Sequence, residues 1–296
     1  MYYQSQTLIF HNGKFTQAHQ AGAHLYSQSL HYGIGVLDGL RAYKTNEGPQ
    51  IFKAFEHYDR FLRSAQKIGI QIPYTLEELV QLTYRLLDRN HLDSAYIRPL
   101  AYVGANMELE TSSETHLMIA AWPWENFRGK EPLDVKISSY QRLHPKSVPM
   151  EAKITGYYVN SVLAMNEAKQ AGFGATLLLD GQGFVAEGAA SNFFYEKEGC
   201  LFTPPAGNIL PGITRATVFD IAAELGIKVI EKLFGPEAVY QADTAFFTGT
   251  ASEIAAIKSI DGHPFPKKWK DTMAAEIQRK YHQRVLLRDY DHYSII

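Results

Sequence analysis

The chain has 296 residues, of which 46% are hydrophobic, and carries a formal net charge of −2. This length suits one large domain or two ordinary ones, with a sizeable core in either case. The near-neutral charge argues against nucleic acid and anionic membrane surfaces as partners, and it favours small neutral or zwitterionic molecules.

Cysteine content and the N-terminal sequence bear on the cellular compartment. Cys200 is the only cysteine, so an internal disulfide is excluded. Residues 1–6 lack the basic start and the apolar stretch of a signal peptide, and no apolar run is long enough to cross a bilayer. We therefore expect a cytoplasmic protein with no membrane partner.

The first part of the chain is expected to form a small α/β layer. Asn12-Gly13 between apolar residues predicts a hairpin. Apolar spacing predicts a helix over 56–68, and a capping box at Thr75 predicts a second helix. The buried stripe of that helix is expected to consist of Leu79, Leu82, Leu86 and Leu87. Residues 94–103 and 116–122 are expected as strands.

The second part alternates strands with helices, which gives the whole chain an α/β fold of the α+β type. Strands are expected near Val135, Ala175, Asn192, Ile227, Thr244 and Ile254, and helices over 157–170, 214–225 and 267–287. Residues 124–132 break both periodicities. We place an interdomain linker at 125–132, between a small domain over 1–124 and a large one over 133–296.

Lys153 is the first candidate for chemistry, because apolar and aromatic residues surround it in Ala152-Lys153-Ile154-Thr155-Gly156-Tyr157-Tyr158. A lysine in such surroundings loses hydration, which favours the neutral, nucleophilic amine of Schiff-base lysines. The alternative is a solvated surface lysine whose alkyl stem lies along its neighbours.

Two glycine turns are candidate anion sites. Leu210-Pro211-Gly212-Ile213-Thr214-Arg215 leads from a Pro-Gly turn into a helix whose first amides are unpaired, and such helix starts bind phosphate well. A plain helix cap by Thr214 is the alternative. Thr248-Gly249-Thr250-Ala251-Ser252 is a second hydroxyl-rich turn with the same ambiguity.

Three charged residues lie in apolar contexts. Glu187 ends a strand between small and aromatic residues, where a protonated pyridine nitrogen is a fitting partner, although a surface hairpin glutamate is commoner. Arg60 lies beside the apolar stripe of its helix and can grip a phosphate bidentately, unless it is solvated. Arg98 is in mid-strand, where a substrate carboxylate or an internal acid must accompany it.

Metal and nucleotide motifs give no further site. The eleven histidines are scattered without the spacing of metal ligands, so no metal is predicted. Gly33-Ile34-Gly35 with Gly39 is one residue too long for a dinucleotide fingerprint. We interpret it as a turn where two backbone segments pass closely.

Together, the lysine, the helix start, the arginines and the carboxylate are the parts that pyridoxal phosphate chemistry needs. The chain also resembles the fold type IV, or class IV, pyridoxal-phosphate aminotransferases, and within them the branched-chain amino acid aminotransferases. The resemblance spans about residues 9–260 and rests on ordered motifs. These are His31-Tyr32-Gly33, Asp38-Gly39-Leu40-Arg41, Tyr96-Ile97-Arg98-Pro99-Leu100, the Lys153 stretch, Glu187-Gly188, Leu210-Pro211-Gly212-Ile213-Thr214-Arg215 and Gly249-Thr250-Ala251-Ser252-Glu253.

The resemblance implies a fold with a larger, pseudo-barrel C-terminal domain, and a role for each motif residue. Lys153 would hold the cofactor covalently and move the substrate proton. Glu187 would bind the pyridine nitrogen, and Tyr158 the phenolic oxygen. The phosphate would be held by Arg60, Ile213, Thr214 and Thr250. The substrate would meet Leu37, Tyr96, Arg98, the amides of Thr250 and Ala251, and Tyr32 from the partner subunit, which implies a homodimer or an assembly of dimers.

The implied reaction is ping-pong transamination between a branched-chain L-amino acid and 2-oxoglutarate. Two features differ from the usual branched-chain pattern: Leu37-Asp38 replaces Phe-Glu, and the loop 104–109 lacks its glycine-rich pattern. Both are expected to alter one pocket wall. A D-amino acid transaminase, an (R)-amine transaminase and an aminodeoxychorismate lyase stay open as alternatives, although Tyr96 with Arg98 favours the branched-chain activity. A non-catalytic binding protein is a remote alternative.

Overall fold

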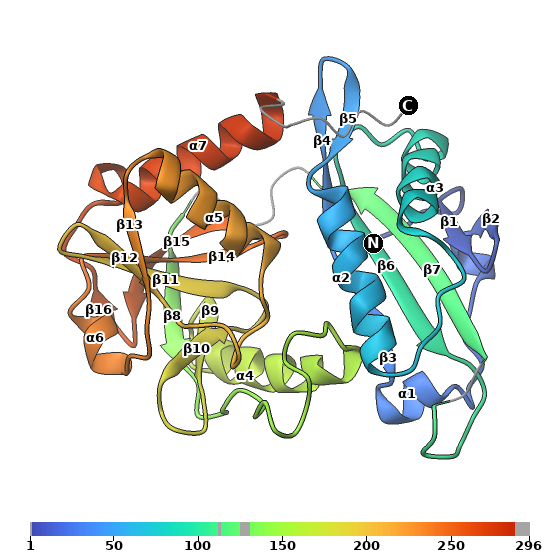
Figure 1. Cartoon of the computed structure of the whole chain (residues 1–296), viewed down its shortest axis with the longest axis horizontal. Helices are drawn as coiled ribbons and strands as arrows, with labels where there is room; N and C mark the ends of the chain where they lie inside the picture. The colour runs from blue at the N-terminus through green and yellow to red at the C-terminus, as the bar shows by residue number, and fades with distance from the viewer. Residues whose placement is uncertain (1, 112–113, 125–130, 288–296) are drawn as a thin grey trace.

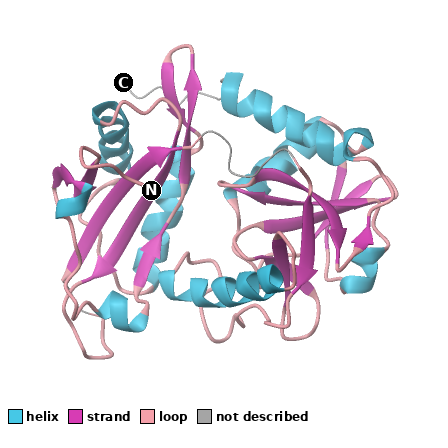
Figure 2. Ribbon diagram, turned by 180° about the vertical axis from the view of Figure 1, so that it is seen from behind, coloured by secondary structure: helices cyan, strands magenta, loops and turns pink. Residues whose placement is uncertain are grey.

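The computed structural model describes residues 2–111, 114–124 and 131–287, and it contains two sheets side by side (Figure 1). Each sheet has its own helices. Figure 2 shows the same two halves from behind, with a helix at the top and another at the bottom of the space between them. None of the described helices is long and apolar enough to cross a membrane.

The first sheet has seven strands in the order β2-β1-β7-β6-β4-β5, with β3 also paired to β6. Its helices α2 and α3 pack on one face (Figure 1). The strands are β1 (Leu8–His11), β2 (Lys14–Gln17), β3 (Gly35–Leu37), β4 (Leu40–Thr45), β5 (Gly48–Ile51), β6 (Ala95–Val103) and β7 (Thr115–Pro123). The helices are η1 (Ala18–Gln20), α1 (Gln28–Tyr32), α2 (Ala54–Lys67) and α3 (Leu76–Arg89).

Most of the elements expected in this half are confirmed. The hairpin turns at Asn12-Gly13, and α3 begins at the predicted capping box, in which the Thr75 hydroxyl accepts from the Glu78 amide. Leu82 is only partly buried, unlike the other three leucines of the expected stripe. Strands β3, β4 and β5 were not expected, because β3 has three residues and the Gly48 turn leaves little alternation on either side.

The second sheet has nine strands in the order β10-β9-β8-β15-β14-β11-β12-β13, with β16 paired to β15. Its strands are β8 (Leu133–Ile137), β9 (Ala175–Leu179), β10 (Val185–Gly188), β11 (Asn192–Lys197), β12 (Cys200–Thr203), β13 (Lys228–Glu231), β14 (Thr244–Gly249), β15 (Glu253–Ile260) and β16 (His263–Pro264). Its helices are η2 (Thr155–Tyr157), α4 (Tyr158–Gln170), α5 (Ile213–Glu224), α6 (Pro236–Tyr240), η3 (Trp269–Asp271) and α7 (Met273–Leu287).

The last helix begins later than predicted. The amphipathic pattern indicated a start at residue 267, but α7 starts at Met273. The Thr272 hydroxyl accepts a hydrogen bond from the Ala275 amide at 3.1 Å, which caps the helix at this point. The preceding residues form the short helix η3 instead, so the hydrophobic period ran past the true boundary.

The two halves touch where the chain enters α4. Gly33 ends α1 in the left-handed conformation, and its carbonyl accepts from the Gly156 amide at 3.0 Å. A Cβ on Gly33 would lie 2.8 Å from the Gly156 Cα, so the expected close backbone passage is confirmed. A partly buried ion pair between Arg41 and Glu253, 2.7 Å apart, joins the sheets at another point. The linker predicted at 125–132 falls mostly outside the described residues, since 125–130 are not described.

Candidate active site

A cavity opens between the two halves of the molecule, in front of the Lys153 segment. All seven residues that the sequence suggested for holding a cofactor line it. Arg60 comes from α2 of the first half, whereas the others come from the second half: Lys153, Tyr158, Glu187, Ile213, Thr214 and Thr250. Residues up to 190 positions apart in the sequence thus surround one space (60 to 250).

Lys153 lies just before η2 and is fixed through its backbone. Its amide donates to the Ser64 hydroxyl at 3.0 Å, and its carbonyl accepts from the Leu37 amide at 3.1 Å. The side chain is half-buried and lines the cavity, with Nζ 5.7 Å from the centre of the Tyr158 ring. Within the described residues no carboxylate forms an ion pair with this amine, which leaves it available for a ligand.

Glu187 lies on the floor of the cavity, in β10, with 4% of its surface exposed. The alternative of a surface glutamate is therefore wrong. One carboxylate oxygen accepts from Arg142 Nε at 2.7 Å and the other from the Asn192 amide group at 3.1 Å. Burial raises the pKa of Glu187, and the Arg142 guanidinium offsets only part of that effect.

Sequence reasoning missed Arg142, and its sequence context explains why. Its neighbours in Ser139-Tyr140-Gln141-Arg142 are polar, so nothing in the pattern indicated burial. In the structure the guanidinium lies against Glu187, and its Nη1 is buried without a hydrogen-bond partner among the described residues. A buried nitrogen of this kind beside a cavity indicates that a ligand or water completes it.

The start of α5 forms the opposite end of the cavity. Gly212 is its N-cap and makes no side-chain cap, so the first amides of the helix stay available. Thr214 is buried within the first turn of the helix and its side chain does not cap it, so the alternative of a plain threonine cap is wrong. A Cβ on Gly212 would lie 2.0 Å from Asn192 Oδ1, which makes glycine necessary here. This end can bind an anion through backbone amides and hydroxyls.

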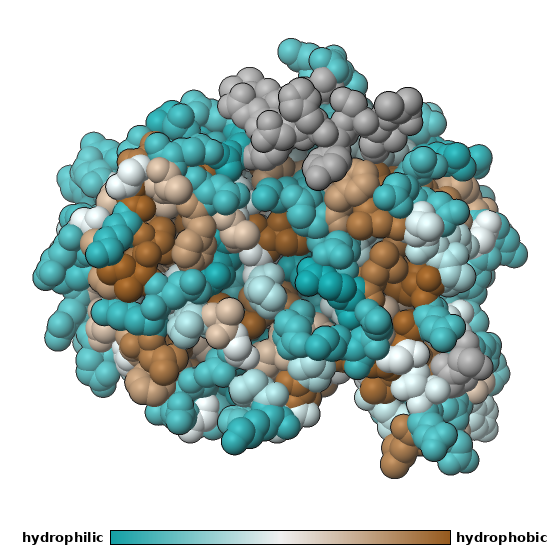
Figure 3. Space-filling model, viewed as in Figure 1, coloured by the Kyte–Doolittle hydropathy of each residue, from teal (hydrophilic) through white to brown (hydrophobic). Residues whose placement is uncertain are grey.

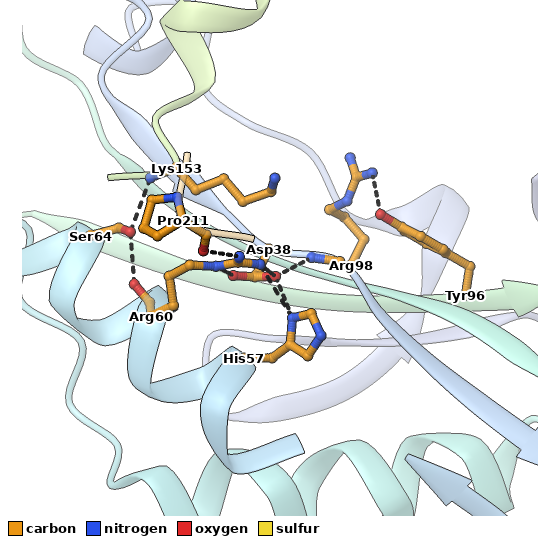
Figure 4. A network of polar contacts seen from close by, with 9 residues as sticks. Asp38, His57, Arg60, Ser64, Tyr96, Arg98, Lys153 and Pro211 are labelled. Atoms are coloured by element: carbon orange, nitrogen blue, oxygen red, sulfur yellow. Dashed lines mark hydrogen bonds and ion pairs between the residues drawn. The ribbon is translucent and has the colours of Figure 1, made fainter. Parts of the chain in front are cut away.

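Arg60 extends from α2 to the same end of the cavity (Figure 4). Its Nε and Nη2 donate to the two oxygens of Asp38 at 2.8 and 2.7 Å, and its Nη1 donates to the Pro211 carbonyl at 3.4 Å. Asp38 is fully buried. The expectation that Leu37-Asp38 together form a pocket wall is corrected for Asp38, because Arg60 and His57 draw its carboxylate away from the substrate side.

A second cavity of about 800 Å³ adjoins the first, and the two share Lys153, Tyr158 and Thr250. Its wall includes every substrate residue expected from this subunit: Leu37, Tyr96, Arg98, Thr250 and Ala251. Trp122 and Trp124 also line it, and sequence reasoning missed both. Their alternation at the end of a strand was the available signal.

Arg98 stacks on aromatic rings in this second cavity. Its guanidinium carbon lies 5.3 Å from the Tyr96 ring and 6.0 Å from the Trp122 ring, and its Nη2 donates to the Tyr96 hydroxyl at 3.2 Å. Arg98 Nε is buried without a hydrogen-bond partner among the described residues. The expected internal acid is thus not paired with it in the described part of the chain, and a carboxylate ligand can take that place.

Tyr32 and the loop 104–109 lie away from both cavities. Tyr32 is 43% exposed at the end of α1, and its hydroxyl donates to the Met107 carbonyl at 3.2 Å. The loop packs beside α1, so within one chain it does not cover the pocket as expected. Neither feature lines the two cavities of its own chain.

Comparisons with known proteins agree with this arrangement. The family model of class IV amino-transferases matches residues 35–260. The branched-chain-amino-acid aminotransferase of Pseudomonas aeruginosa is 39% identical over 280 residues, which cover 93% of this chain and 91% of that protein.

Solved structures agree in shape as well as in sequence. The branched-chain aminotransferase of Thermoproteus uzoniensis with norvaline matches with a TM-score of 0.92, 36% identity and 96% coverage of both chains. The branched-chain amino acid aminotransferase of Thermobaculum terrenum in its PLP form matches with a TM-score of 0.89 and 30% identity, over 96% of this chain and 95% of that chain. From its sequence, its mixed α/β fold and its site, this chain belongs to the class IV aminotransferase family.

Proposed function

We propose that the chain transfers the amino group of branched-chain L-amino acids to 2-oxoglutarate with pyridoxal phosphate as cofactor. One observation carries the proposal: Lys153 lies between a buried carboxylate, Glu187, and an anion-binding helix start, α5, in one cavity. The relatives named as branched-chain aminotransferases support the choice of substrate. We propose in addition that the chain consists of a small domain over residues 1–124 and a large domain over residues 133–296.

The residues around the cavity fit pyridoxal phosphate. The amine of Lys153 suits its carbonyl carbon, and the buried carboxylate of Glu187 suits a protonated ring nitrogen. The amides at the start of α5, with the hydroxyls of Thr214 and Thr250, suit its phosphate. When bound, this cofactor acts as an electron sink for the pair left at the substrate Cα.

The protein groups have separate tasks in that reaction. Lys153 Nζ would take the proton from the substrate Cα and return it on the cofactor side, as a general base and then a general acid. Glu187 would keep the ring nitrogen protonated, with Arg142 holding the carboxylate in place. Tyr158 would donate its hydroxyl proton to the phenolic oxygen of the ring. Arg60 Nη1 would join the phosphate donors of α5 and Thr250.

The second cavity would hold the substrate. The amides of Thr250 and Ala251 and the guanidinium of Arg98 would bind carboxylates, while Leu37 and the aromatic rings would surround the side chain. The amino donor and the 2-oxo acid would use this one space in turn, so the first product must leave before the second substrate enters. This order of events predicts ping-pong kinetics.

We also propose that the enzyme is a homodimer in the cytoplasm. Large apolar side chains are exposed around α1 and the loop that packs beside it: Leu25, Tyr26, Leu30, Tyr32, Met107 and Leu109. Figure 3 shows that hydrophobic residues also interrupt the polar surface on the face in that view. Exposed apolar surface of this extent is typical of a subunit interface. Such an interface would bring Tyr32 to the partner's substrate cavity.

The substrate is tested by the half-reaction with the amino donor alone. Purified enzyme loaded with pyridoxal phosphate is mixed with L-leucine, L-isoleucine, L-valine, D-alanine or (R)-1-phenylethylamine, and the loss of the absorbance band of the bound cofactor is followed in time. Fast conversion with the three branched-chain L-amino acids is expected. Conversion with D-alanine or the amine alone would instead assign one of the related transaminase activities.

The covalent role of Lys153 is tested by substitution. Lys153→Ala should lower the half-reaction rate by about 10⁴-fold, because the proton carrier is lost. Borohydride reduction should attach the cofactor to the wild-type chain but not to the variant, as read from the intact mass. Lys67→Ala, which removes a surface lysine paired with Glu151, is the matched control and should behave as wild type.

A further inference from the structure

Asp38 and Arg60 form a buried contact directly behind the phosphate end of the cavity (Figure 4). The carboxylate takes two of the three guanidinium nitrogens, Nε at 2.8 Å and Nη2 at 2.7 Å. This two-pronged contact fixes the plane of the guanidinium as well as its position. Nη1 is the nitrogen that Asp38 leaves unused, and the partner it does have, the Pro211 carbonyl, is 3.4 Å away.

Asp38 is itself held from several sides. The backbone amide of Gly39 donates to its Oδ1 at 2.7 Å, and His57 Nδ1 lies 2.8 Å from the same oxygen. Because an ionised carboxylate can only accept, Nδ1 of His57 carries the proton that faces it. Both His57 and Asp38 are almost entirely excluded from solvent. The carboxylate therefore has little freedom to follow Arg60 if the guanidinium moves.

The backbone around Asp38 connects this pair to the lysine. The Asp38 amide donates to the Pro99 carbonyl at 3.1 Å, and the preceding amide, that of Leu37, donates to the Lys153 carbonyl at 3.1 Å. Arg60 is joined to the same segment, since the Ser64 hydroxyl bonds to the Arg60 carbonyl and accepts from the Lys153 amide. The arginine and the lysine thus share one rigid support.

We propose that Asp38 is a positioning residue for the cofactor phosphate: oriented by His57 and the Gly39 amide, it holds Arg60 so that Nη1 faces the phosphate subsite between α5 and Thr250. The inference rests on the proposed function, because it presumes a phosphorylated cofactor in this cavity. It gives Asp38 a geometric task that a simple counter-ion lacks. A counter-ion weakens the attraction of Arg60 for an anion, whereas a positioning residue strengthens it.

The test compares two ligands that differ only in the phosphate. Dissociation constants of pyridoxal phosphate and of pyridoxal are measured on cofactor-free enzyme by absorbance and by quenching of tryptophan fluorescence. Asp38→Asn should weaken the binding of pyridoxal phosphate by about tenfold or more, whereas the binding of pyridoxal should change little. When one partner of a buried charge pair is altered, the other partner is no longer held in its orientation. Asp38→Glu, which keeps the carboxylate, should recover part of the preference.

Matched variants separate positioning from damage to the fold. Asp59→Asn makes the same change on the helix that carries Arg60, where Asp59 pairs with Arg63 at the surface, and should leave both constants unchanged. When Arg60→Lys is already present, adding Asp38→Asn should not change the preference for pyridoxal phosphate over pyridoxal any further. His57→Asn should reduce the preference for pyridoxal phosphate over pyridoxal less than Asp38→Asn does, since the Gly39 amide still orients the carboxylate.

The outcomes distinguish this inference from the proposed function. If wild-type enzyme binds neither ligand, the proposed function fails and the inference fails with it. If wild type prefers pyridoxal phosphate and Asp38→Asn keeps or increases that preference, Asp38 is only a counter-ion and the inference alone is overturned. An equal loss for both ligands in Asp38→Asn, with no recovery in Asp38→Glu, overturns it as well.

Discussion

Asp38 and Glu187 are both buried carboxylates beside an arginine, yet their protonation equilibria move in opposite directions. At Asp38 burial alone would raise the pKa, but Arg60 and His57 outweigh burial and hold the pKa well below its usual range. At Glu187 burial outweighs Arg142, and the pKa is raised. Asp38 lies behind Arg60, between β3 and β4 of the first sheet, whereas Glu187 lines the cavity from β10 of the second sheet.

The difference comes from the hydrogen-bond donors that surround each carboxylate. The Asp38 carboxylate accepts from two nitrogens of the Arg60 guanidinium, from the His57 imidazole and from the Gly39 backbone amide. Glu187 receives a single nitrogen of Arg142 at 2.7 Å, and its other donors, Asn192 and the Leu210 amide, are neutral. Glu187 is therefore left with capacity for a cationic partner, as a protonated pyridine nitrogen would be, whereas Asp38 is already fully compensated.

The largest expected effect separates the two carboxylates by activity. Glu187→Gln should lower the half-reaction rate by about 10²- to 10³-fold, because a neutral amide no longer keeps the ring nitrogen protonated as charge develops. Stopped-flow absorbance with L-leucine measures it. Glu196→Gln, which changes another buried glutamate, is the control and should leave the rate near that of wild type. Equal rates for Glu187→Gln and wild type would remove the functional distinction between the two carboxylates.

The next effect separates them by stability. Asp38→Asn should destabilise the cofactor-free protein by about 3–5 kcal/mol, because it leaves the buried charge of Arg60 uncompensated. Glu187→Gln should cost clearly less, since Arg142 donates to this carboxylate through one nitrogen only and burial already disfavours the charge of Glu187. Urea unfolding at neutral pH measures both. A similar loss in the two variants would show that the number of partners does not decide stability here.

The sequence predicted one of these two sites better than the other. Glu187, Lys153 and the start of α5 stood in motifs whose apolar or glycine-rich surroundings indicated their chemistry. Asp38 was interpreted together with Leu37 as part of a pocket wall, because the pair replaces the usual Phe-Glu before Gly39. Its partner Arg60 is 22 positions away, and no periodicity reports which of two distant side chains will meet.

Residues outside motifs could not be predicted for a related physical reason. Arg142 lies in a polar, largely exposed loop, and its side chain reaches Glu187 because the loop is held against β9 by the hydrogen bond from the Arg142 amide to the Leu179 carbonyl. The short strand β3 has too few residues to show alternation, and it is stabilised by pairing with β6. In both cases tertiary contacts decide the local structure. Sequence patterns predict a position that is set by tertiary contacts only when a recognisable local motif also lies there.

A third prediction uses the opposite pKa shifts. The folded-state pKa of Asp38 lies below its unfolded value, so the stabilisation is present at neutral pH and is lost only as pH falls below about 4. The stability difference between wild type and Asp38→Asn should therefore stay constant from neutral pH to about pH 5 and shrink in stronger acid. Urea unfolding across this range is the measurement.

For Glu187 the sign is reversed. Its folded-state pKa lies above the unfolded value, so its contribution is fully present below about pH 4 and is lost as pH rises through the folded-state pKa. Wild type should thus gain stability relative to Glu187→Gln on acidification from neutral pH. A gain on acidification for both carboxylates, or for neither, would contradict the opposite shifts.

The smallest effect concerns the residue next to Asp38. Successive residues of an extended segment point to opposite sides, which explains why Leu37 lines the substrate cavity while Asp38 faces Arg60. Leu37→Phe should therefore narrow the substrate cavity and leave the contact between Asp38 and Arg60 at the phosphate end unchanged. We expect kcat/KM for L-leucine to fall by about tenfold relative to L-valine, with an unchanged dissociation constant for pyridoxal phosphate.

Steady-state kinetics with both amino acids and the cofactor titration together check this division of tasks. Leu233→Phe makes the same change at an exposed position and should alter neither quantity. Weaker binding of pyridoxal phosphate without a change in substrate preference would mean that Leu37 acts through Asp38. The neighbouring side chains would then form one unit, and the contrast between the substrate side and the phosphate side of this segment would not hold.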